Sequence, residues 1–504
     1  MRSNSETQWF RLSDFVRQRL GLHFPPERWP DLERGVTAAA RQAGVADVED
    51  YVEWLLESPL ARQQTELLAS HLTVGETYFF REPHTFRILE EQILPELVQS
   101  RRSAGKRLRI WSAGCATGEE PYSIAISLFQ ELPDRADWNL TILASDINPA
   151  FLDKAAKGVY KDWSFRDVSP ELKDRYFRRR QGGGWEVLKP IKQMLTFSYL
   201  NLADDVYPSL VNNTNAMDIV FCRNVLMYFA PACARQVVAK LYRSLAEGGW
   251  LICSRAECSQ ELYSQLVPVC FSGVTLYRKD SYRSSQPAVV LSPTEPAAPP
   301  GKAPDELLTP ERPTSLWPHT PAGSQSQGQR FDAPESPSSP YEQALALYRN
   351  GHYADAAELL ATNLADSQPD AVSLALLARA GANCGQLDAA LAWCRQAVAA
   401  DRLNAGLHFL EATILQEKGA IEEAASSLSK SLYLAPDFVL AHFALGHLAL
   451  RQGKLSQAGK SFDNALALLR THSPTDILSE SEGITAGRLV EIIQSTNHRQ
   501  RVAG

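Results

Sequence analysis

A repeat of 34 residues in the second half of the chain limits the fold more than any other feature. Glycine recurs at this spacing at Gly351, Gly385, Gly419 and Gly453. Three further columns keep the same register, namely Ala356, Ala390, Ala424 and Ala458; Tyr353, Leu387, Ile421 and Leu455; and Ala344, Ala378, Ala412 and Gly446. A period of this length fits one helical hairpin per repeat, with glycine at the turn, small residues where helices approach closely and large apolar residues in the seam. The sequence predicts a stack of such hairpins.

The pattern resembles the tetratricopeptide repeat, as four repeats over residues 337–472. The usual proline between repeats stands clearly only at Pro436, and the usual aromatic residue of the first helix is mostly missing. Over residues 473–504 we expect a polar-faced capping helix that includes Arg488, followed by a tail. Because solenoids expose a concave surface, we expect a protein or peptide partner on the repeats. Helical hairpins without a partner are the alternative.

Composition changes sharply between the two halves of the chain. Thirteen of the thirty prolines lie between Ser281 and Pro340, among Ser, Gly, Gln and Ala with few large apolar residues. Such a segment buries too little apolar surface to offset its ordering entropy. We predict a disordered, proline-rich linker over residues 281–336 between two independently folded halves.

The chain as a whole has the composition of an ordinary soluble protein. Its 504 residues correspond to about three domains. Its net charge of -7 gives no general reason for a polyanionic partner, so nucleic acid is not expected. No apolar run has the length of a signal peptide core or a membrane span, which predicts a cytoplasmic protein. The eight cysteines form no Cys-x-x-Cys pair, so we expect reduced thiols and no metal site.

The first half divides into a helical region and a region of alternating strands and helices. Residues 1–75 carry apolar residues at helix spacing and predict a small all-α domain. Within residues 76–280, strand-like runs at 108–112, 140–145, 218–222 and 249–254 alternate with helical runs at 122–130, 149–157 and 231–246. This alternation predicts a parallel sheet with helices on both faces and a ligand crevice at the carboxyl ends of the strands. Residues 158–200 interrupt it as an inserted helix and β-hairpin.

Residues 109–122 join an apolar strand to a glycine turn that ends in two carboxylates. The glycines permit positive φ or close backbone approach, whereas Glu119 and Glu120 would repel the pyrophosphate of a dinucleotide. A cationic, adenosine-bearing cofactor such as S-adenosylmethionine suits this turn better. Asp146 ends the next strand, where a carboxylate can accept hydrogen bonds from both ribose hydroxyls. A helix N-cap explains Asp146 equally well.

Further motifs give the first half a specific resemblance. They are Thr77-Tyr-Phe-Phe-Arg81, the run from Trp111 to Ser123, Ala144-Ser-Asp-Ile-Asn148, Asn201-Leu202 and the run from Phe221 to Phe229. Over about residues 5–280 the chain resembles the CheR-type chemotaxis receptor methyltransferases. The resemblance implies an α/β, Rossmann-like S-adenosylmethionine-dependent methyltransferase with an N-terminal all-α domain and a small β insertion. The C-terminal α-solenoid of tetratricopeptide repeats is added to this unit.

The resemblance also implies which residues hold the cofactor. They are Thr77, Arg81, Glu119, Asp146, Asn201, Leu202, Arg223 and Asn224. Glu119 would meet the amino or sulfonium charge and Asp146 the ribose. Asn201 and Leu202 would contact the adenine. The run from Phe221 to Phe229 has a second explanation when it is taken alone: Arg223 pairs with a neighbouring carboxylate and Tyr228 lies in the core.

In that family the reaction moves a methyl group to glutamate carboxylates on the cytoplasmic helices of a chemoreceptor, giving glutamyl methyl esters and S-adenosylhomocysteine. A glutamate with a pKa of about 4.3 is already ionised at neutral pH, so no general base is needed. We expect Arg81 and Tyr228 to grip this carboxylate. The protein would reach the membrane only through the receptor. The added repeats resemble methyltransferases of surface and biofilm signalling systems, the WspC type.

One position departs from the family. Familiar members have asparagine two positions before the threonine of the first motif, where this chain has Gly75. Loss of a side-chain bond there would weaken cofactor affinity, unless backbone groups and water take its place. The alternatives to an active receptor methyltransferase are therefore a catalytically weak scaffold whose repeats assemble signalling partners, and a methyltransferase with a different acceptor.

Overall fold

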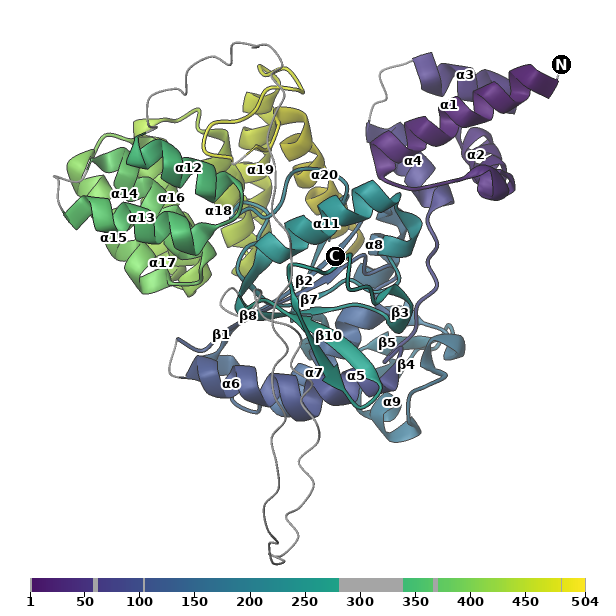
Figure 1. Ribbon diagram of the computed structural model, residues 1–504, viewed down its shortest axis with the longest axis horizontal. Coiled ribbons are helices and arrows are strands. Elements are labelled where there is room, and N and C mark those ends of the chain that lie inside the picture. The colour runs from purple at the N-terminus through teal and green to yellow at the C-terminus, as the bar shows by residue number, and fades with distance from the viewer. Residues whose placement is uncertain are drawn as a thin grey trace, which may run out of the picture.

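The computed structural model describes residues 2–57, 62–102, 105–280, 339–365, 370–481 and 483–503. The predicted linker over residues 281–336 lies outside them. Figure 1 shows a helical region at the N-terminus, a central α/β region and a helical solenoid at the C-terminal end. Among the described residues, no helix is both long enough and apolar enough to cross a membrane.

Four helices form the N-terminal region: α1 (Arg2–Leu20), α2 (Trp29–Ala43), α3 (Val48–Glu57) and α4 (Arg62–Leu72). On α1, Leu12, Val16 and Leu20 recur every four residues and are buried against apolar residues of the other three helices. This spacing places them on one helix face, which is the physical reason that the helices pack. The predicted all-α domain is confirmed.

The central sheet has seven strands in the order β6-β2-β1-β7-β8-β10-β9. They are β1 (Arg107–Ala113), β2 (Asn139–Asp146), β6 (Leu195–Tyr199), β7 (Met217–Phe221), β8 (Leu245–Ile252), β9 (Val267–Phe271) and β10 (Val274–Arg278). The first five are parallel, but β10 pairs antiparallel with β8 and β9. The prediction of a parallel sheet is confirmed for the four strands that it named, and it did not include the antiparallel edge of β9 and β10. Only Ser272 and Gly273 separate β9 from β10, and so short a connection can join only antiparallel strands.

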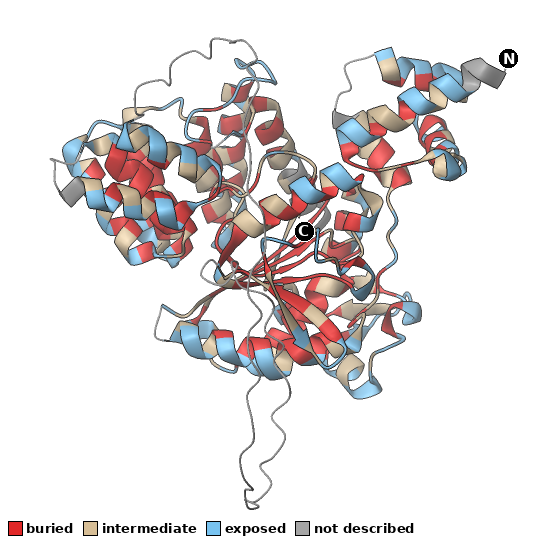
Figure 2. Cartoon of the chain, in the orientation of Figure 1, coloured by how far each residue is buried: buried red, intermediate tan, exposed pale blue. Residues whose placement is uncertain are grey.

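Helices cover both faces of the sheet, as predicted, and the core lies between the layers (Figure 2). The helices of this region are α5 (Pro83–Ile88), α6 (Leu94–Arg102), α7 (Glu119–Glu131), α8 (Pro149–Lys157), α9 (Pro170–Tyr176), α10 (Lys189–Lys192) and α11 (Pro231–Ser244). Along β1, Ile110 faces the apolar cluster with α6 and α7, and Trp111 faces the cluster with α11. The insertion contains α9 and a three-stranded antiparallel sheet of β3 (Val159–Tyr160), β4 (Phe177–Arg179) and β5 (Trp185–Val187).

The repeats form four pairs of helices. They are α12 (Pro340–Arg349) and α13 (Tyr353–Ala365), α14 (Ala371–Asn383) and α15 (Leu387–Ala400), α16 (Ala405–Lys418) and α17 (Ile421–Leu434), and α18 (Val439–Arg451) and α19 (Leu455–Leu469). The four repeat glycines end the first helix of each pair with φ between 71° and 81°, which favours glycine. The alanine column at positions 356, 390, 424 and 458 is fully buried. The predicted hairpin stack is confirmed.

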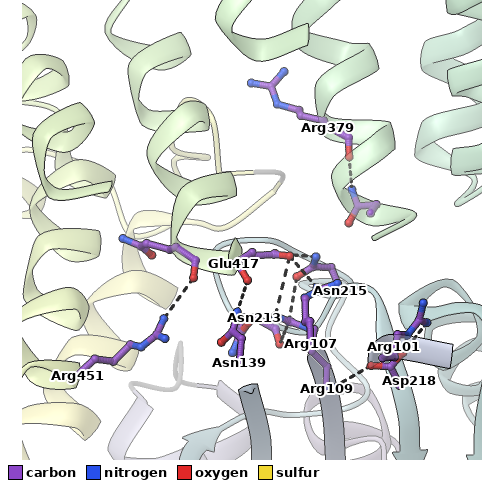
Figure 3. Close-up of polar contacts among 12 residues, drawn as sticks. Arg101, Arg107, Arg109, Asn139, Asn213, Asn215, Asp218, Arg379, Glu417 and Arg451 are labelled. Atoms are coloured by element: carbon purple, nitrogen blue, oxygen red, sulfur yellow. Dashed lines mark hydrogen bonds and ion pairs between the residues drawn. The ribbon is translucent and has the colours of Figure 1, made fainter. Parts of the chain in front are cut away.

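The solenoid packs against the α/β region, which the prediction of two independent halves did not include. The Glu417 carboxylate, near the end of α16, lies 2.9 Å from Nη2 of Arg107 and accepts a 2.8 Å hydrogen bond from Nδ2 of Asn215. Its backbone carbonyl accepts a hydrogen bond from Asn139 (Figure 3). Arg107 and Asn139 begin β1 and β2, so the solenoid docks at the amino ends of the strands.

A final helix, α20 (Ala486–Ala503), lies between the solenoid and the sheet (Figure 1). Leu489 and Ile493 are buried in the core that α18 and α19 form. Arg488 faces β6, beside Tyr199, and Ile492 contacts both this side and the α18–α19 core. The predicted capping helix is present, but its second face is covered by the α/β region rather than exposed as a polar face.

Candidate active site

A cavity lies at the carboxyl ends of β1, β2 and β7, beneath the N-terminal helices. The empty space at this site, including open solvent at its mouth, is about 920 Å³. Eight of the predicted site residues line it: Thr77, Arg81, Asp146, Asn201, Leu202, Arg223, Asn224 and Tyr228. The predicted crevice is therefore present at the edge of the sheet that topology requires.

Asp146 ends β2 and is held by the backbone of two neighbouring turns. Its Oδ2 accepts a 2.8 Å hydrogen bond from the backbone N–H of Ala116, and its Oδ1 accepts one of 2.8 Å from that of Asn148. Burial raises the pKa of this carboxyl to about 6, against the opposing effect of these hydrogen bonds. The N-cap of α8 is Asn148, whose Oδ1 accepts from the N–H groups of Ala150 and Phe151. Asp146 is therefore available to a ligand.

The two acids at the start of α7 have different surroundings. The Glu119 carboxylate is buried and accepts hydrogen bonds from Thr117 Oγ1 at 2.6 Å and from Ser164 Oγ at 3.0 Å. It is not among the residues that line the cavity, whereas Glu120 is. Burial raises the pKa of both carboxyls. This arrangement favours Glu120 over the predicted Glu119 as the carboxylate nearest to a ligand.

Arg223 links the first and last motifs across the cavity floor. Its Nη1 lies 3.1 Å from Oε2 of Glu120, and its Nη2 lies 3.2 Å from Oε2 of Glu82. Nη2 also donates a 2.7 Å hydrogen bond to the backbone carbonyl of Arg81. The two carboxylates offset the cost of burying this guanidinium. Arg223 thereby fixes the chain segment that carries Arg81 at the cavity wall.

A residue that we did not predict holds the turn after β7. Asn224 has φ of 57°, and its N–H and that of Val225 donate to the two oxygens of the Glu257 carboxylate. Glu257 is buried and also accepts a 2.6 Å hydrogen bond from Ser254 Oγ. The only signal in the sequence is an acid shortly after β8, the neighbour of β7 in the sheet.

The N-terminal helices supply another wall that the sequence did not reveal. Leu20 and Leu22 line the cavity, and Leu22 forms a β-bridge with Phe229. Asn201 ties the two regions together, because its Nδ2 donates to the carbonyl of Arg19 at 3.0 Å. These contacts close the cavity over the strand ends.

Gly75 lies against an aromatic ring at the cavity wall. A Cβ atom at this position would stand 2.5 Å from Cζ of Phe151, a residue that also lines the cavity. Contacts that short do not occur between carbon atoms, so the ring would have to move for any larger residue. Phe151 therefore occupies space next to the position where familiar members carry asparagine.

Comparisons with known proteins agree with this geometry. Residues 75–266 match the CheR methyltransferase, SAM binding domain, and residues 341–405 and 409–472 match the tetratricopeptide repeat. A chemotaxis protein methyltransferase of Vibrio cholerae is 30% identical over 260 residues, which are 52% of this chain and 88% of that protein. A probable chemotaxis protein methyltransferase of Rhizobium etli is 36% identical over 220 residues, which are 43% of this chain and 80% of that protein. The chain belongs to the chemotaxis protein methyltransferase family.

One relative of this methyltransferase family also spans the repeats. A probable biofilm formation methyltransferase, WspC, of Pseudomonas putida is 29% identical over 462 residues, which are 92% of this chain and 98% of that protein. The cofactor of the matched domain is S-adenosylmethionine. The cavity fits it, because Asp146 and Glu120 are acceptors for hydroxyl or cationic groups and Leu20, Leu22 and Leu202 form an apolar wall.

Proposed function

We propose that the protein methylates glutamate side-chain carboxylates of a chemoreceptor-like signalling protein, giving glutamyl methyl esters, in a chemosensory pathway of the surface-sensing or biofilm type. The observation that carries the proposal is the position of Arg81 and Tyr228 in the same cavity as Asp146. A cation and a phenol can donate to an incoming carboxylate without reacting with it. The printed names of the relatives, among them chemotaxis and biofilm methyltransferases, support this acceptor and pathway.

The residues that would hold S-adenosylmethionine follow from their environments. Asp146 accepts from the ribose hydroxyls, since its carboxylate is fixed by backbone donors. Leu202 packs against the adenine, and Asn201 fixes the segment that carries Leu202. Glu120 meets the amino or sulfonium charge in place of Glu119. The cofactor supplies an electrophilic methyl group on its sulfonium.

The acceptor carboxylate is held rather than chemically activated. The Arg81 side chain is oriented by a 2.7 Å hydrogen bond from its Nη1 to the carbonyl of Glu76 and by the ring of Tyr78, 5.8 Å from Cζ. Together with Tyr228, it aligns the glutamate oxygen with the methyl group and replaces part of its hydration. A glutamate is ionised at neutral pH, so alignment and desolvation supply the rate enhancement.

The solenoid contributes a protein contact in this proposal, as repeat solenoids present extended binding surfaces. The reaction would take place in the cytoplasm, where the receptor's signalling helices are exposed. The contact of this protein with the membrane is then indirect, through the receptor.

The test is transfer of tritiated methyl from S-adenosylmethionine to chemoreceptors in membranes of the source organism. We expect label that mild base releases as volatile methanol, because carboxyl methyl esters are base-labile. Arg81→Ala and Tyr228→Phe should bind cofactor but transfer little label. Label that resists base would identify a different acceptor, and full transfer by both variants would remove the roles given to these side chains.

A further inference from the structure

The segment that forms one wall of the cofactor cavity is built around Asp204. Leu200, Asn201 and Leu202 line the cavity. Asn201 Nδ2 donates a 2.8 Å hydrogen bond to Oδ1 of Asp204, and the Asp204 N–H donates to the Asn201 carbonyl at 3.1 Å. Asp204 therefore closes a tight turn that orients Asn201 and the residue after it.

Arg488 reaches this turn from α20, at the far end of the chain. Its side chain is buried, and its Nη2 lies 4.0 Å from Oδ2 of Asp204. Its Cζ lies 5.0 Å from the ring centre of Tyr199, the last residue of β6 before the cavity wall. Nη1 is held by Glu491 at 2.7 Å. Within the described residues, Nε and Nη2 have no hydrogen-bond acceptor, so the guanidinium keeps unused donors on this side.

The solenoid also holds the other end of the same loop. Leu210 packs into the apolar cluster of α14, α15 and α16, and Val211 packs against the cluster that contains Phe409. Asn215 donates to Glu417 on α16 (Figure 3). The loop over residues 200–216 is thus fixed at both ends by elements that lie more than 150 residues later in the chain.

We infer that Arg488, in the helix that follows the solenoid, is a positioning residue for cofactor binding that acts through Asp204 on Asn201 and Leu202. At 4.0 Å the buried guanidinium makes no hydrogen bond to Asp204, but its charge attracts Oδ2 and so favours the orientation in which Oδ1 accepts from Asn201. Lys240 also holds this turn, through hydrogen bonds to the carbonyls of Ala203 and Asp204, so loss of the Arg488 charge should loosen the turn and the adenine wall without unfolding them. The inference concerns cofactor affinity and does not depend on which acceptor is methylated.

The experiment uses the full chain with Arg488→Met, which keeps an apolar stem but removes the charge. We expect the Kd for S-adenosylhomocysteine, measured by calorimetry, to rise about five- to tenfold. The KM for S-adenosylmethionine should rise with it, while kcat at saturating cofactor stays close to that of the parent. The matched control is Arg395→Met, which removes a guanidinium that pairs with Glu411 and Glu423 inside the solenoid and should leave the Kd unchanged.

A double-variant cycle separates this route from a general loss of stability. In an Asp204→Asn background, Arg488→Met should weaken cofactor binding by less than twofold, because the carboxylate on which Arg488 acts is already absent. Arg488→Lys keeps a charge and should restore part of the affinity. If Arg488→Met does not fold, Arg488→Lys and Asp204→Asn decide, since each is expected to weaken binding. The inference would be overturned if Arg488→Lys and Asp204→Asn both kept the parental Kd. It would also be overturned if Arg488→Met raised the Kd by the same factor in the parent and in the Asp204→Asn background.

Discussion

Acidification should weaken cofactor binding through Asp146. Burial raises the pKa of this carboxyl to about 6, and only the ionised form offers acceptors to both ribose hydroxyls while keeping its two backbone donors. About nine tenths of the protein carries this charge at pH 7 and about one tenth at pH 5, which is roughly a tenfold fall in affinity, or about 1.4 kcal/mol. Because the cofactor binds the deprotonated carboxylate more tightly, cofactor affinity falls as the pH drops through the pKa of Asp146.

Asp146→Asn isolates this carboxyl from the other acids of the cavity. Ala116 and Asn148 donate to different oxygens of Asp146, and an amide has only one oxygen. One backbone N–H therefore loses its acceptor, and the charged acceptor for the ribose is lost as well. Hydrogen bonds to charged groups contribute about 1.5–3 kcal/mol, so binding of S-adenosylhomocysteine should weaken roughly ten- to hundredfold at pH 7.

The assay is calorimetric titration with S-adenosylhomocysteine between pH 5 and 7.5. The parent should lose affinity steadily below about pH 6, and Asp146→Asn should show a weaker but much flatter profile. Glu76→Gln is the control, because it changes an exposed acid at the cavity mouth and should keep the parental slope. A parent without pH dependence, or an equally steep profile in Asp146→Asn, would refute this reasoning.

Three further predictions concern the cavity wall, the acceptor and the docking surface. Gly75→Asn should weaken binding of S-adenosylhomocysteine, because the new side chain meets a ring at 2.5 Å, and Phe151→Ala in the same chain should restore part of the loss. Arg81→Ala should raise the KM for the receptor more than the KM for the cofactor. Glu417→Ala should lower the free energy of unfolding in urea by about 3 kcal/mol, because it removes the carboxylate that faces Arg107 and the buried Arg109. The exposed Glu423→Ala is its control.

Each of these has a result that contradicts it. Failure of Phe151→Ala to improve Gly75→Asn would mean that the ring is not the obstacle. Equal changes of both KM values in Arg81→Ala would place this arginine with the cofactor rather than the acceptor. A Glu417→Ala protein as stable as Glu423→Ala would show that the buried cluster in Figure 3 is not needed for docking.

The sequence predicted those parts of the fold and site that repeat or alternate locally. The glycine columns and the strand–helix alternation are read within one hairpin or one βα unit, and both are present. The strand-end position of Asp146 and Asn224 follows from the same alternation. The edge formed by β9 and β10 was missed because these short strands follow no helical run that would set them apart.

Contacts between segments that are distant in the chain could not be predicted from the sequence. Nothing near Glu120 in the sequence distinguishes it from Glu119; both carboxylates have hydrogen-bond partners, but only Glu120 lines the cavity. Glu257, just after the neighbouring strand β8, stabilises the Asn224 turn. Arg488 approaches Asp204 from α20, which follows the linker and the whole solenoid in the chain. Such pairings depend on tertiary packing, which local propensity does not encode.

The chain itself covers part of the solenoid surface. Glu480, in the segment between α19 and α20, pairs with Arg379 of α14 and lies against Gly406 of α16. A tethered segment competes at an effective concentration of about millimolar order, so a free peptide that needs this surface binds more weakly than its contacts alone suggest. A partner that used this surface would have to displace Glu480 from Arg379.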